Sequence, residues 1–401
     1  MALIVKKFGG SSVADAECLR RVSGLIADTY RQGNDVVVVL SAQGDTTDEL
    51  IEKARELNPN PSAREMDMLL ANGEQISIAL CAIALESLGL PVISLAGWQV
   101  GMLTNTNYGN ARINKLSAQR VKMELDKKNI VLVAGFQGVN RYDDVTTFGR
   151  GGSDTTAVAL AAVLHADVCQ IYTDVDGVYT ADPRLVAGAQ KLEEITYDEM
   201  LELATLGAQV LHNRSVEMAK RYGVPLSVLS SFKQIPGTQV KEVLKVEQMN
   251  VSGVAKDSNV ARIALVGLPD APGIAFNVFS LLARKSVNVD IILQSIGREE
   301  TKDISFTVSK NHLDIARQTL EDNQDRLGFR EMVVSDAISK ISIVGAGMVG
   351  NPGVAAQMFE ALASANINIQ MISTSEIKVS VLIDRKDADL AVQVIHNKFF
   401  E

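Results

Sequence analysis

The sequence predicts an α/β protein in which a layered, mostly parallel sheet is followed by two small units of β-α-β-β type. Up to about residue 240, short β-branched runs that are apolar on both faces alternate with longer helical stretches, the pattern of buried parallel strands covered by helices. Beyond that point, one block of sequence occurs twice at a constant offset of 80 positions. A sheet-based domain is therefore followed by a tandem repeat.

Length and composition limit the partners of the chain. With 401 residues, 47% of them hydrophobic and 22% charged, it is long enough for two or three domains that each bury a core. Its formal net charge of −9 disfavours nucleic acid and anionic membranes. A phosphate or carboxylate ligand must therefore be bound by local positive groups.

The cysteines, the histidines and the apolar runs argue against several other classes of protein. The three cysteines lie far apart in apolar patterns, which favours buried thiols, and the four histidines have no zinc-ligand spacing. The longest apolar runs have the length of strands, and the N-terminus lacks the core of a signal peptide. We expect a cytoplasmic protein without a metal site built from its own side chains.

Periodicity predicts the elements of the first part. The stretches Asp15–Gln32 and Met66–Leu88 predict helices. Ligands of parallel sheets bind beyond the carboxyl ends of the strands, so the loops that follow the strands should carry the chemistry. The predicted strands are Leu3–Val5, Val36–Leu40, Pro91–Leu95, Ile130–Ala134, Val168–Thr173 and Leu226–Leu229.

The tandem repeat makes up the second part. Ala271–Leu293 aligns with Asn351–Ser373, and each copy carries Pro-Gly before its predicted helix. Strands precede and follow each copy, which gives units of roughly 60 to 80 residues, near the lower limit for a free-standing core. Such units should pack against one another or across a subunit interface. We place the boundary before them in the turn-rich, charged segment Gln234–Gln248.

One motif in the repeat imitates a dinucleotide site. The segment Val344–Gly350 contains G-x-G-x-x-G after a strand. The matching loop Gly267–Gly273 lacks those glycines, and no acid ends the strand that follows the motif. The chain also ends about 50 residues later, too soon for a Rossmann domain. We therefore reject a nicotinamide cofactor.

The first candidate loop is VKKFGGSS, which ends the first strand. Gly9 and Gly10 permit a tight turn with exposed N–H groups, and Ser11 or Ser12 can cap the next helix. Lys7 can offer a point charge to a phosphate. It is not a Walker A loop, and a Gly-Gly turn alone indicates a structural role equally well.

The second candidate loop is SAQGDTTDEL, directly after the strand VVVVL. Ser41, Thr46 and Thr47 offer hydroxyl groups to a ligand. The same residues also suit an ordinary helix start with Asp45 as N-cap. Both interpretations can hold together.

Glu74 is a third candidate, near the start of an otherwise apolar helix. Its carboxylate can favour the helix dipole or face solvent. If it points into a cleft instead, it is suited to bind an ammonium group.

The fourth candidate is GRGGSDTT, Gly149–Thr156, which leads into a predicted helix at Ala157–Leu164. Its glycines let the backbone approach a ligand, and Ser153 or Asp154 can cap the helix, whose N-terminus then faces an anion. Arg150 supplies a fixed cation. Taken alone, GGSD indicates no more than a capped turn.

The last candidate is YTDVDGVYTADPR, Tyr172–Arg184, at the carboxyl end of a strand. Its acids, Tyr179 and Arg184 suit a nucleotide, with the tyrosine near the base and the arginine on a phosphate. A calcium loop competes, but the closing glutamate of an EF-hand is missing.

Together, KFGGSS, SAQGDTTDEL, NGEQIS, GRGGSDTT, VDGVYTADPR and the doubled tail resemble the aspartokinase family from the first strand to the C-terminus. The resemblance implies an amino-acid kinase catalytic domain at 1–240 and a linker with a strand shared with the second regulatory unit at 241–261. Two ACT domains would follow, at 262–338 and 339–401. Members of the family phosphorylate the side-chain carboxylate of L-aspartate with ATP and Mg²⁺, the first step toward lysine, threonine and methionine.

The resemblance also implies residue roles, with Lys7 bridging the phosphates and Asp154 orienting Lys7. The implied substrate contacts are Ser41, Asp45, Thr46, Thr47, Glu74, Arg150, Gly151, Gly152 and Ser153. The implied nucleotide contacts are Lys7, Phe8, Gly9, Gly10, Thr173, Asp174, Tyr179, Asp182 and Arg184. The metal would be bound mainly by ATP and water.

The same resemblance makes the tail a sensor for lysine, threonine or both. Its side chains could equally pair strands at a dimer interface, and a homodimer or higher oligomer is expected. Some relatives begin a separate short subunit at a position that corresponds to Met249. The implied effector positions are Asp270, Gly273, Ile274, Ala275, Asn288, Asp290, Ile291, Gln294, Thr374, Ser375 and Glu376.

One departure from the family and two alternatives complete the sequence-based hypotheses. Gln209 stands where relatives often have a lysine that reaches the nucleotide, which predicts a raised KM for ATP. A non-catalytic amino-acid sensor would require damage at Lys7, Arg150 or Asp154, all of which are intact. A kinase of glutamate or acetylglutamate fits the intact SAQGDTTDEL segment and the doubled tail less well.

Overall fold

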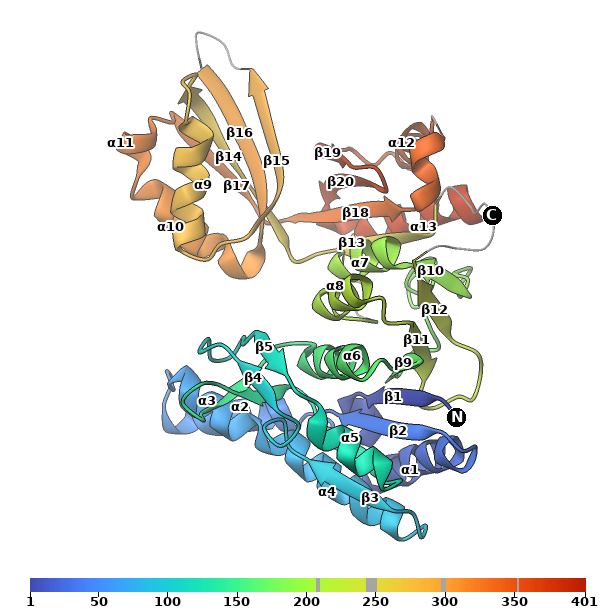
Figure 1. The fold of residues 1–401 in the computed structure, drawn as a ribbon. Helices are drawn as coiled ribbons and strands as arrows, with labels where there is room; N and C mark the ends of the chain where they lie inside the picture. The colour runs from blue at the N-terminus through green and yellow to red at the C-terminus, as the bar shows by residue number, and fades with distance from the viewer. Residues whose placement is uncertain (207–209, 243–250, 297–300, 352) are drawn as a thin grey trace. The chain divides into compact units, whose positions relative to one another are not determined.

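The chain, described by a computed structural model at residues 1–206, 210–242, 251–296, 301–351 and 353–401, forms two compact units (Figure 1). The first comprises Met1–Tyr179 and Gln190–Gln248, and the second comprises Thr180–Ala189 and Met249–Glu401. The short segment Thr180–Ala189 thus groups with the C-terminal residues. Part of the predicted boundary Gln234–Gln248 lies outside the described residues.

An eight-stranded sheet forms the centre of the first unit, in the order β10-β12-β11-β9-β1-β2-β6-β3. Every neighbouring pair is parallel except β11 and β12, which confirms the mostly parallel sheet. The carboxyl ends of β9, β1, β2 and β6 therefore lie side by side. The strands are β1 Leu3–Phe8, β2 Asp35–Leu40, β3 Val92–Leu95, β6 Ile130–Ala134, β9 Val168–Thr173, β10 Glu194–Thr196, β11 Leu226–Ser230 and β12 Thr238–Lys241.

Helices cover both faces of this sheet (Figure 1). Side chains of α1 and α4, among them Ile26 and Leu85, share a core with Phe8, Val38 and Leu132 of the strands. The helix α6 packs on β1, β2 and β9 from the other face. The helices of the unit are α1 Ala16–Arg31, α2 Thr46–Leu57, α3 Ala63–Leu70, α4 Asn72–Glu86, α5 Gln119–Asp126, α6 Gly152–Leu164, α7 Tyr197–Thr205 and α8 Asn213–Tyr222, with the 3₁₀ turn η1 at Gly10–Val13.

The predicted helix Met66–Leu88 is divided into α3 and α4 at Ala71. By length and composition alone, the stretch Ala63–Glu86 is apolar enough to cross a membrane. It packs instead on the sheet through Ile78 and Cys81, as a core helix of a globular unit does. All three cysteines are buried free thiols, as the sequence predicts.

Periodicity does not predict a second sheet of the first unit, in the order β5-β4-β7-β8. Its strands have three or four residues each, too few for a clear alternation. The last of them, β8, ends two residues before Gly149–Thr156, the fourth candidate stretch. The strands are β4 Met102–Thr104, β5 Ile113–Leu116, β7 Gln137–Val139 and β8 Val145–Thr147.

The second unit contains two antiparallel sheets of four strands each, in the orders β15-β16-β14-β17 and β13-β18-β20-β19. The strand β13, which precedes the first copy of the repeat, pairs with β18 of the second copy. The strands are β13 Gly253–Asp257, β14 Val260–Pro269, β15 Val289–Ile296, β16 Thr301–Ser309, β17 Glu331–Ser335, β18 Ile338–Val344, β19 Met371–Thr374 and β20 Lys378–Asp384. The helices are α9 Ile274–Arg284, α10 Leu313–Glu321, α11 Gln324–Leu327, α12 Val354–Ser364 and α13 Ala388–Phe400, with 3₁₀ turns η2 Lys310–His312, η3 Ala346–Gly350 and η4 Arg385–Asp387.

The two copies of the repeat match in backbone as well as in sequence. Their helices α9 and α12 begin and end at equivalent positions. Gly273 and Gly353 stand at the N-caps with φ of 90° and 104°, the left-handed region that glycine adopts without strain. Ser286 and Asn366, after the helices, both have φ of 56°. The predicted β-α-β-β repeat is confirmed down to individual dihedral angles.

The two repeat units meet inside the second unit of the chain. Lys340 of β18 is buried, and its Nζ lies 2.5 Å from Asp290 of β15 and 3.6 Å from Asp257 of β13. A small apolar cluster that includes Ile291 and Met371 also joins residues of both copies. The expectation that such small units pack against one another is therefore met.

Candidate active site

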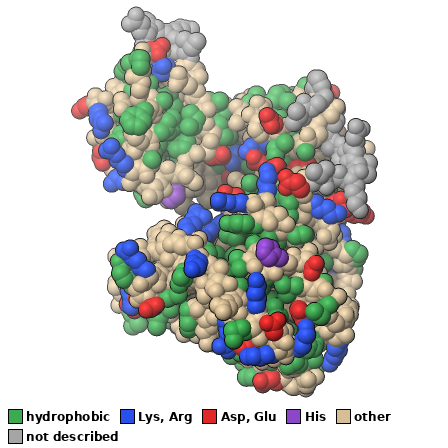
Figure 2. All heavy atoms as spheres, in the orientation of Figure 1, with side chains coloured by type: hydrophobic (Ala, Val, Ile, Leu, Met, Phe, Trp, Pro, Cys, Tyr) green, Lys and Arg blue, Asp and Glu red, His purple; other side chains and the backbone are tan. Residues whose placement is uncertain are grey.

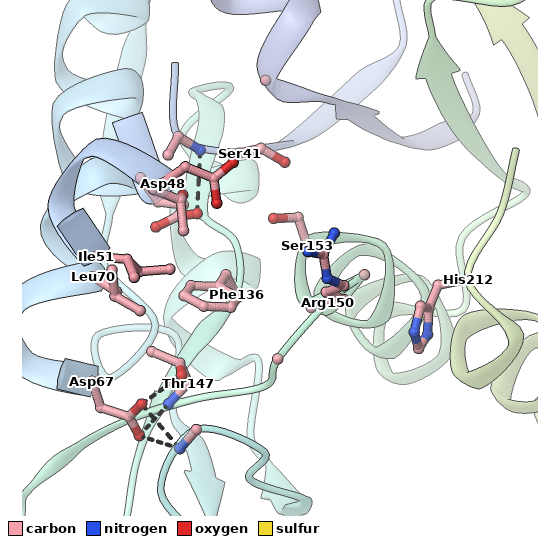
Figure 3. Close-up of a pocket in the computed structure, with 18 of the residues that line it drawn as sticks. Ser41, Asp48, Ile51, Asp67, Leu70, Phe136, Thr147, Arg150, Ser153 and His212 are labelled. Carbon is pink, nitrogen blue, oxygen red and sulfur yellow. Dashed lines mark hydrogen bonds between the residues drawn. The ribbon is translucent and has the colours of Figure 1, made fainter. Parts of the chain in front are cut away.

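A cavity of about 1120 Å³ opens in the first unit where the loops after β1, β2 and β6 meet the start of α6 (Figure 3). Residues from most of the candidate loops line it, which brings together stretches far apart in sequence. Among the predicted residues in its wall are Lys7, Gly9, Gly10, Ser41, Thr47, Glu74, Arg150, Gly151, Gly152, Ser153 and Asp154.

The adjacent lysines of β1 point to opposite faces of the sheet, because side chains alternate along a strand. Lys6 is 2% exposed and donates to the Tyr172 hydroxyl at 2.9 Å on the side of α1. Burial lowers the pKa of Lys6 to about 8, with Asp28 opposing the shift. Lys7 faces α6, and its Nζ lies 2.7 Å from Asp154 Oδ1. Only the second lysine can serve a ligand in the cavity.

The loop after β1 requires glycine at one position. A Cβ on Gly10 would lie 2.9 Å from the Ala42 carbonyl oxygen, so the loops after β1 and β2 approach too closely for a side chain. Ser11 and Ser12 do not cap the next helix, because they lie within η1. Asp15 caps α1 by accepting from Cys18 N at 2.8 Å.

The turn before α6 carries Arg150 between two left-handed glycines, Gly149 and Gly151, with φ of 74° and 69°. The predicted cap is wrong: Gly151 is the N-cap, and Ser153 and Asp154 lie in the first turn of a helix that begins at Gly152. This start, five residues before the predicted one at Ala157, places Asp154 within reach of Lys7.

Close packing on both sides fixes this turn. A Cβ on Gly151 would lie 2.2 Å from the His212 ring, and one on Gly152 would lie 2.8 Å from the Phe136 ring. Figure 3 shows His212 beside the turn and Phe136 in the middle of the cavity. Arg150 is exposed, and among the described residues its guanidinium has no hydrogen-bond or ion-pair partner. It is available to an anionic ligand.

Glu74 is buried in the wall of the cavity, at 3% exposure. Its Oε1 accepts from Ala42 N at 3.2 Å, whereas Oε2 has no hydrogen-bond partner among the described residues. Burial raises the pKa of Glu74 to about 8. A cationic ligand would donate a hydrogen bond to Oε2 and would supply the positive charge that stabilises the ionised form of Glu74.

Asp67 of α3 is a buried carboxylate that the sequence analysis did not single out. Its oxygens accept from Gly109 N and Thr147 N at 2.9 Å each and from Thr147 Oγ1 at 2.6 Å (Figure 3). Burial raises the pKa of Asp67, and these hydrogen bonds oppose the shift. The residue ties the loop before β5 and the end of β8 to α3, and so closes one end of the cavity.

Other predicted site residues lie at the margin. Asp45 stands at the N-cap of α2 without a side-chain hydrogen bond, so the predicted cap interaction is absent there, and neither it nor Thr46 lines the cavity. The Phe8 side chain is fully buried and stacks on Tyr172, with ring centroids 4.5 Å apart. Only its backbone reaches the loop.

Of the predicted nucleotide residues, Lys7, Gly9 and Gly10 line the cavity, whereas those from Thr173 to Arg184 lie at or after the end of β9 and outside its wall. Thr173 Oγ1 donates to Asp174 at 2.9 Å, at the strand end adjacent to that of β1. Tyr179 ends the first unit, whereas Asp182 and Arg184 belong to the second, where they form an ion pair at 2.7 Å. The hydrogen bond from Arg184 holds the pKa of Asp182 below its usual value.

The predicted effector positions lie in three places: the loop after β14 with the start of α9, β15 with the residue before it, and the end of β19 with the two residues after it. Asp270 pairs with Lys302 at 2.5 Å, and Ile291 is buried. Ile274 is also buried and Ala275 is half-buried, and the other predicted effector positions are exposed: Gly273, Asn288, Asp290, Gln294, Thr374, Ser375 and Glu376. Gln209 and Met249 lie outside the described residues.

Comparison with known proteins identifies the class of this fold. A model of the amino acid kinase family matches residues 2–230, and an ACT domain model matches residues 263–324 and 341–399. Fold and site together define an amino acid kinase with a pair of ACT domains.

Full-length relatives narrow this class. The chain is 52% identical to an aspartokinase of Mycolicibacterium smegmatis and 51% identical to one of Corynebacterium glutamicum, covering 100% of this chain and 96% of each relative. E. coli aspartokinase III, solved with aspartate and ADP, superposes with a TM-score of 0.84 at 27% identity over the full length of both chains. Its complex with lysine and aspartate superposes with a TM-score of 0.76 at 28% identity over both full lengths. The chain belongs to the aspartokinase family.

Proposed function

We propose that the chain transfers the γ-phosphoryl group of ATP to the side-chain carboxylate of L-aspartate, giving 4-phospho-L-aspartate. The observation that carries this proposal is the Lys7–Asp154 ion pair in one cavity with Arg150 and Glu74. A cation for phosphate, a cation for carboxylate and a carboxylate for ammonium are the groups that an amino acid and a nucleotide require. The relatives named above support the assignment.

The reaction needs no general base, because a carboxylate nucleophile is already ionised at neutral pH. Phosphoryl transfer then depends on positioning and on neutralising charge in the transition state. Lys7 supplies that charge, and Asp154 holds its ammonium group in place. The N–H groups of Gly9 and Gly10 add donors at the same strand end.

Three groups orient aspartate in this proposal. Arg150 binds the α-carboxylate as a planar fork, and the glycines beside it let the ligand approach the backbone. Glu74 accepts from the α-ammonium group. Ser41, Thr47 and Ser153 offer hydroxyl groups around them.

The nucleotide is assigned to the loop after β9, next to the glycines after β1. Thr173, Asp174 and Tyr179 approach it from the first unit in this proposal, and Asp182 and Arg184 belong to the same stretch of chain. The described residues contain no group of three His, Cys, Asp or Glu side chains that could enclose a metal. In this proposal a Mg²⁺ ion would be bound mainly by the phosphates of ATP and by water, and it would neutralise phosphate charge.

We further propose feedback control by lysine, threonine or both, through the ACT pair. The ACT matches and the lysine-bound E. coli relative support this role. Turnover measured with each amino acid at millimolar concentration tests it, and insensitivity to both would reject it.

Assembly and location remain part of the proposal. The edge strands β15 and β19 expose Ile292, Leu293 and Ile372, which supports an oligomer formed through this part. Detection of a fragment beginning at Met249 in cell extract would reveal a separate short subunit. Acidic and basic side chains are interspersed on the face in Figure 2. We propose that the enzyme acts in the cytoplasm without nucleic-acid or membrane partners.

A coupled ADP-release assay with aspartate, glutamate and acetylglutamate tests the reaction. Of these three acceptors, we expect only aspartate to give turnover. Turnover with glutamate or acetylglutamate would assign another kinase of this fold. ADP release with none of them would favour a non-catalytic amino-acid sensor.

A further inference from the structure

A second cavity, of about 430 Å³, adjoins the candidate active site in the first unit. Three arginines line it: Arg112 from the segment before β5, Arg150 from the turn before α6, and Arg214 from the first turn of α8. Arg150 and His212 line both cavities, so the two spaces meet at this turn.

The protein neutralises the positive charge in this cavity only in part, through Glu217 and Asp154 at a distance. Arg214 donates to the carbonyl oxygens of Phe148 and Ala111 at 3.2 and 2.9 Å, which uses two of its five N–H groups. Within the described part of the chain, Arg112 and Arg150 have no hydrogen-bond or ion-pair partner for their side chains. The cavity wall contains one acid, Glu217, which forms no ion pair within 4.0 Å with a described residue.

The arginines also act on one another. Burial and then the charge of Arg112 lower the pKa of Arg214 to about 10, and Glu217 opposes the shift. Burial also lowers the pKa of His212, where Asp154 opposes the shift and both arginines add to it. The cavity therefore holds like charges within electrostatic range, in a chain whose net charge is −9. Such a cluster favours an anion that pairs with all of its members.

Two neighbouring groups add to this potential. The ten-residue helix α8 begins at Asn213, in the cavity wall, where the helix dipole places partial positive charge. The N–H groups of Arg214 and Ser215 already donate to Asn213 Oδ1 and to the His212 carbonyl oxygen, so the helix terminus acts through its dipole. The Nδ1 atom of His212 is buried without a hydrogen-bond partner among the described residues. The three arginines, the start of α8 and the His212 imidazole therefore line the same cavity.

We propose that this cavity is a second anion site, which binds a small dianion through Arg112 and Arg214 and shares Arg150 with the substrate cavity. Its ligand carries carboxylate or phosphate groups, so a dicarboxylate such as L-aspartate and inorganic phosphate are the two sources of that chemistry. An ion bound here draws the Arg150 guanidinium toward it. That consequence rests on the proposed function, in which Arg150 binds the α-carboxylate, whereas the binding itself does not.

Calorimetric titration of inorganic phosphate into the full chain, without nucleotide or aspartate, tests the site. We expect Arg112→Gln to weaken phosphate binding about tenfold, because one charge-assisted contact is lost. The matched control Arg20→Gln, on the exposed side of α1, should bind as the wild type does. Lys7→Met should also retain binding, because Lys7 belongs to the other cavity.

The proposal would be overturned if the wild type and Arg112→Gln bound phosphate with equal affinity. It would also be overturned if Lys7→Met lost phosphate binding while Arg112→Gln retained it. The source of the anion follows from titration with L-aspartate. If the wild type binds two equivalents of L-aspartate per chain and Arg112→Gln binds one, the ligand of the second site is a dicarboxylate. If both proteins bind one equivalent of L-aspartate, the ligand of the second site is a phosphate-like ion.

Kinetics test the shared arginine separately. Phosphate should inhibit competitively against aspartate, and Arg112→Gln should relieve that inhibition by the same factor as in calorimetry. Phosphate binding that depends on Arg112 without competition would refute the sharing of Arg150. If the chain has no kinase activity at all, the calorimetric result still decides whether the anion site exists.

Discussion

Lys7 Nζ lies 2.7 Å from Asp154 Oδ1, and both side chains are largely shielded from solvent, at 13% and 10% exposure. The lysine is the last residue but one of a central strand, and the aspartate lies in the first turn of the helix that packs on it. Both residues belong to regular elements of the fold, so the Lys7 ammonium group has little freedom to move away from the carboxyl end of β1. This preorganised charge is the centre of the proposed mechanism.

Asp154→Asn should lower kcat by about 100-fold to 1000-fold, with KM for aspartate changed little. The asparagine still fits the helix, but it no longer fixes the lysine where charge develops in the transition state. Steady-state kinetics with both substrates measure the two constants. A loss confined to the aspartate KM would instead assign Asp154 to substrate binding.

The double variant Lys7→Met with Asp154→Asn should be hardly slower than Lys7→Met alone. Residues that act as one unit are strongly non-additive, because the second change removes nothing that the first left in place. Fully additive losses would show that the two side chains act independently, despite their ion pair.

Aspartate binding should release up to one proton per chain at pH 7, because the buried Glu74, with a pKa of about 8, is mostly protonated before the ammonium group arrives. Calorimetry in buffers of different ionisation enthalpy measures this number. Glu74→Gln should release no proton and should bind aspartate more weakly. Proton release that survives in Glu74→Gln would come from another group.

The same carboxyl group makes the stability depend on pH. Its pKa in the folded chain is raised above the ordinary value of 4.5, so the folded state binds one more proton than the unfolded state between about 4.5 and about 8. As pH rises through that window, Glu74 therefore lowers the free energy of unfolding by about 1.4 kcal/mol per pH unit. Urea unfolding at several pH values should show a difference of this slope between the wild type and Glu74→Gln.

Much of this architecture could be predicted from the sequence, for a local reason. The buried strands are apolar runs bounded by turn residues, so β6 and β9 begin and end where the pattern places them. The repeat is visible because both copies need the same glycine before their helix, at Gly273 and Gly353. Each of these signals lies within a few neighbouring residues.

The remaining features depend on contacts between distant segments. Asp67 stands between two methionines of a helix, and only the loop at Gly109 and the strand end at Thr147 make it part of the site. Ser153 has the chemistry of an N-cap, but the left-handed Gly151 takes that position because His212 packs against it. A local pattern cannot reveal such partners.

Arg150→Ala should raise the KM for aspartate about 100-fold and the KM for ATP by no more than about threefold, because a two-pronged contact to the α-carboxylate is lost. Arg150→Lys should recover only part of the difference, since a single ammonium cannot reproduce the planar fork. Steady-state titration of each substrate measures both constants. Equal increases in the two KM values would assign the turn to the wrong ligand.

Gly151→Ala tests the support of the same arginine without removing its charge. The new Cβ would stand 2.2 Å from the His212 ring, at a backbone angle that alanine adopts only with strain. The turn must shift, and the aspartate KM should rise in this variant as well. The new Cβ would also stand 2.3 Å from His212 Cβ, so relief of the clash requires His212→Gly, which removes both the ring and that Cβ. The variant Gly151→Ala with His212→Gly should recover part of the affinity, whereas no recovery would mean that the backbone angle alone is responsible.

Asp67→Asn should destabilise the first unit by about 2–4 kcal/mol. In the wild type, the carboxylate of Asp67 accepts hydrogen bonds from Gly109 N, Thr147 N and Thr147 Oγ1. The amide of asparagine has only one acceptor oxygen, so one of these three donors would face an amide N–H instead. The midpoint of urea unfolding should fall, and the KM for aspartate should rise as that end of the cavity loosens. Asp126→Asn, on the exposed side of α5, provides a matched control and should leave both quantities unchanged. Unfolding midpoints that agree between the two variants would mean that Asp67 does not hold the cavity wall together.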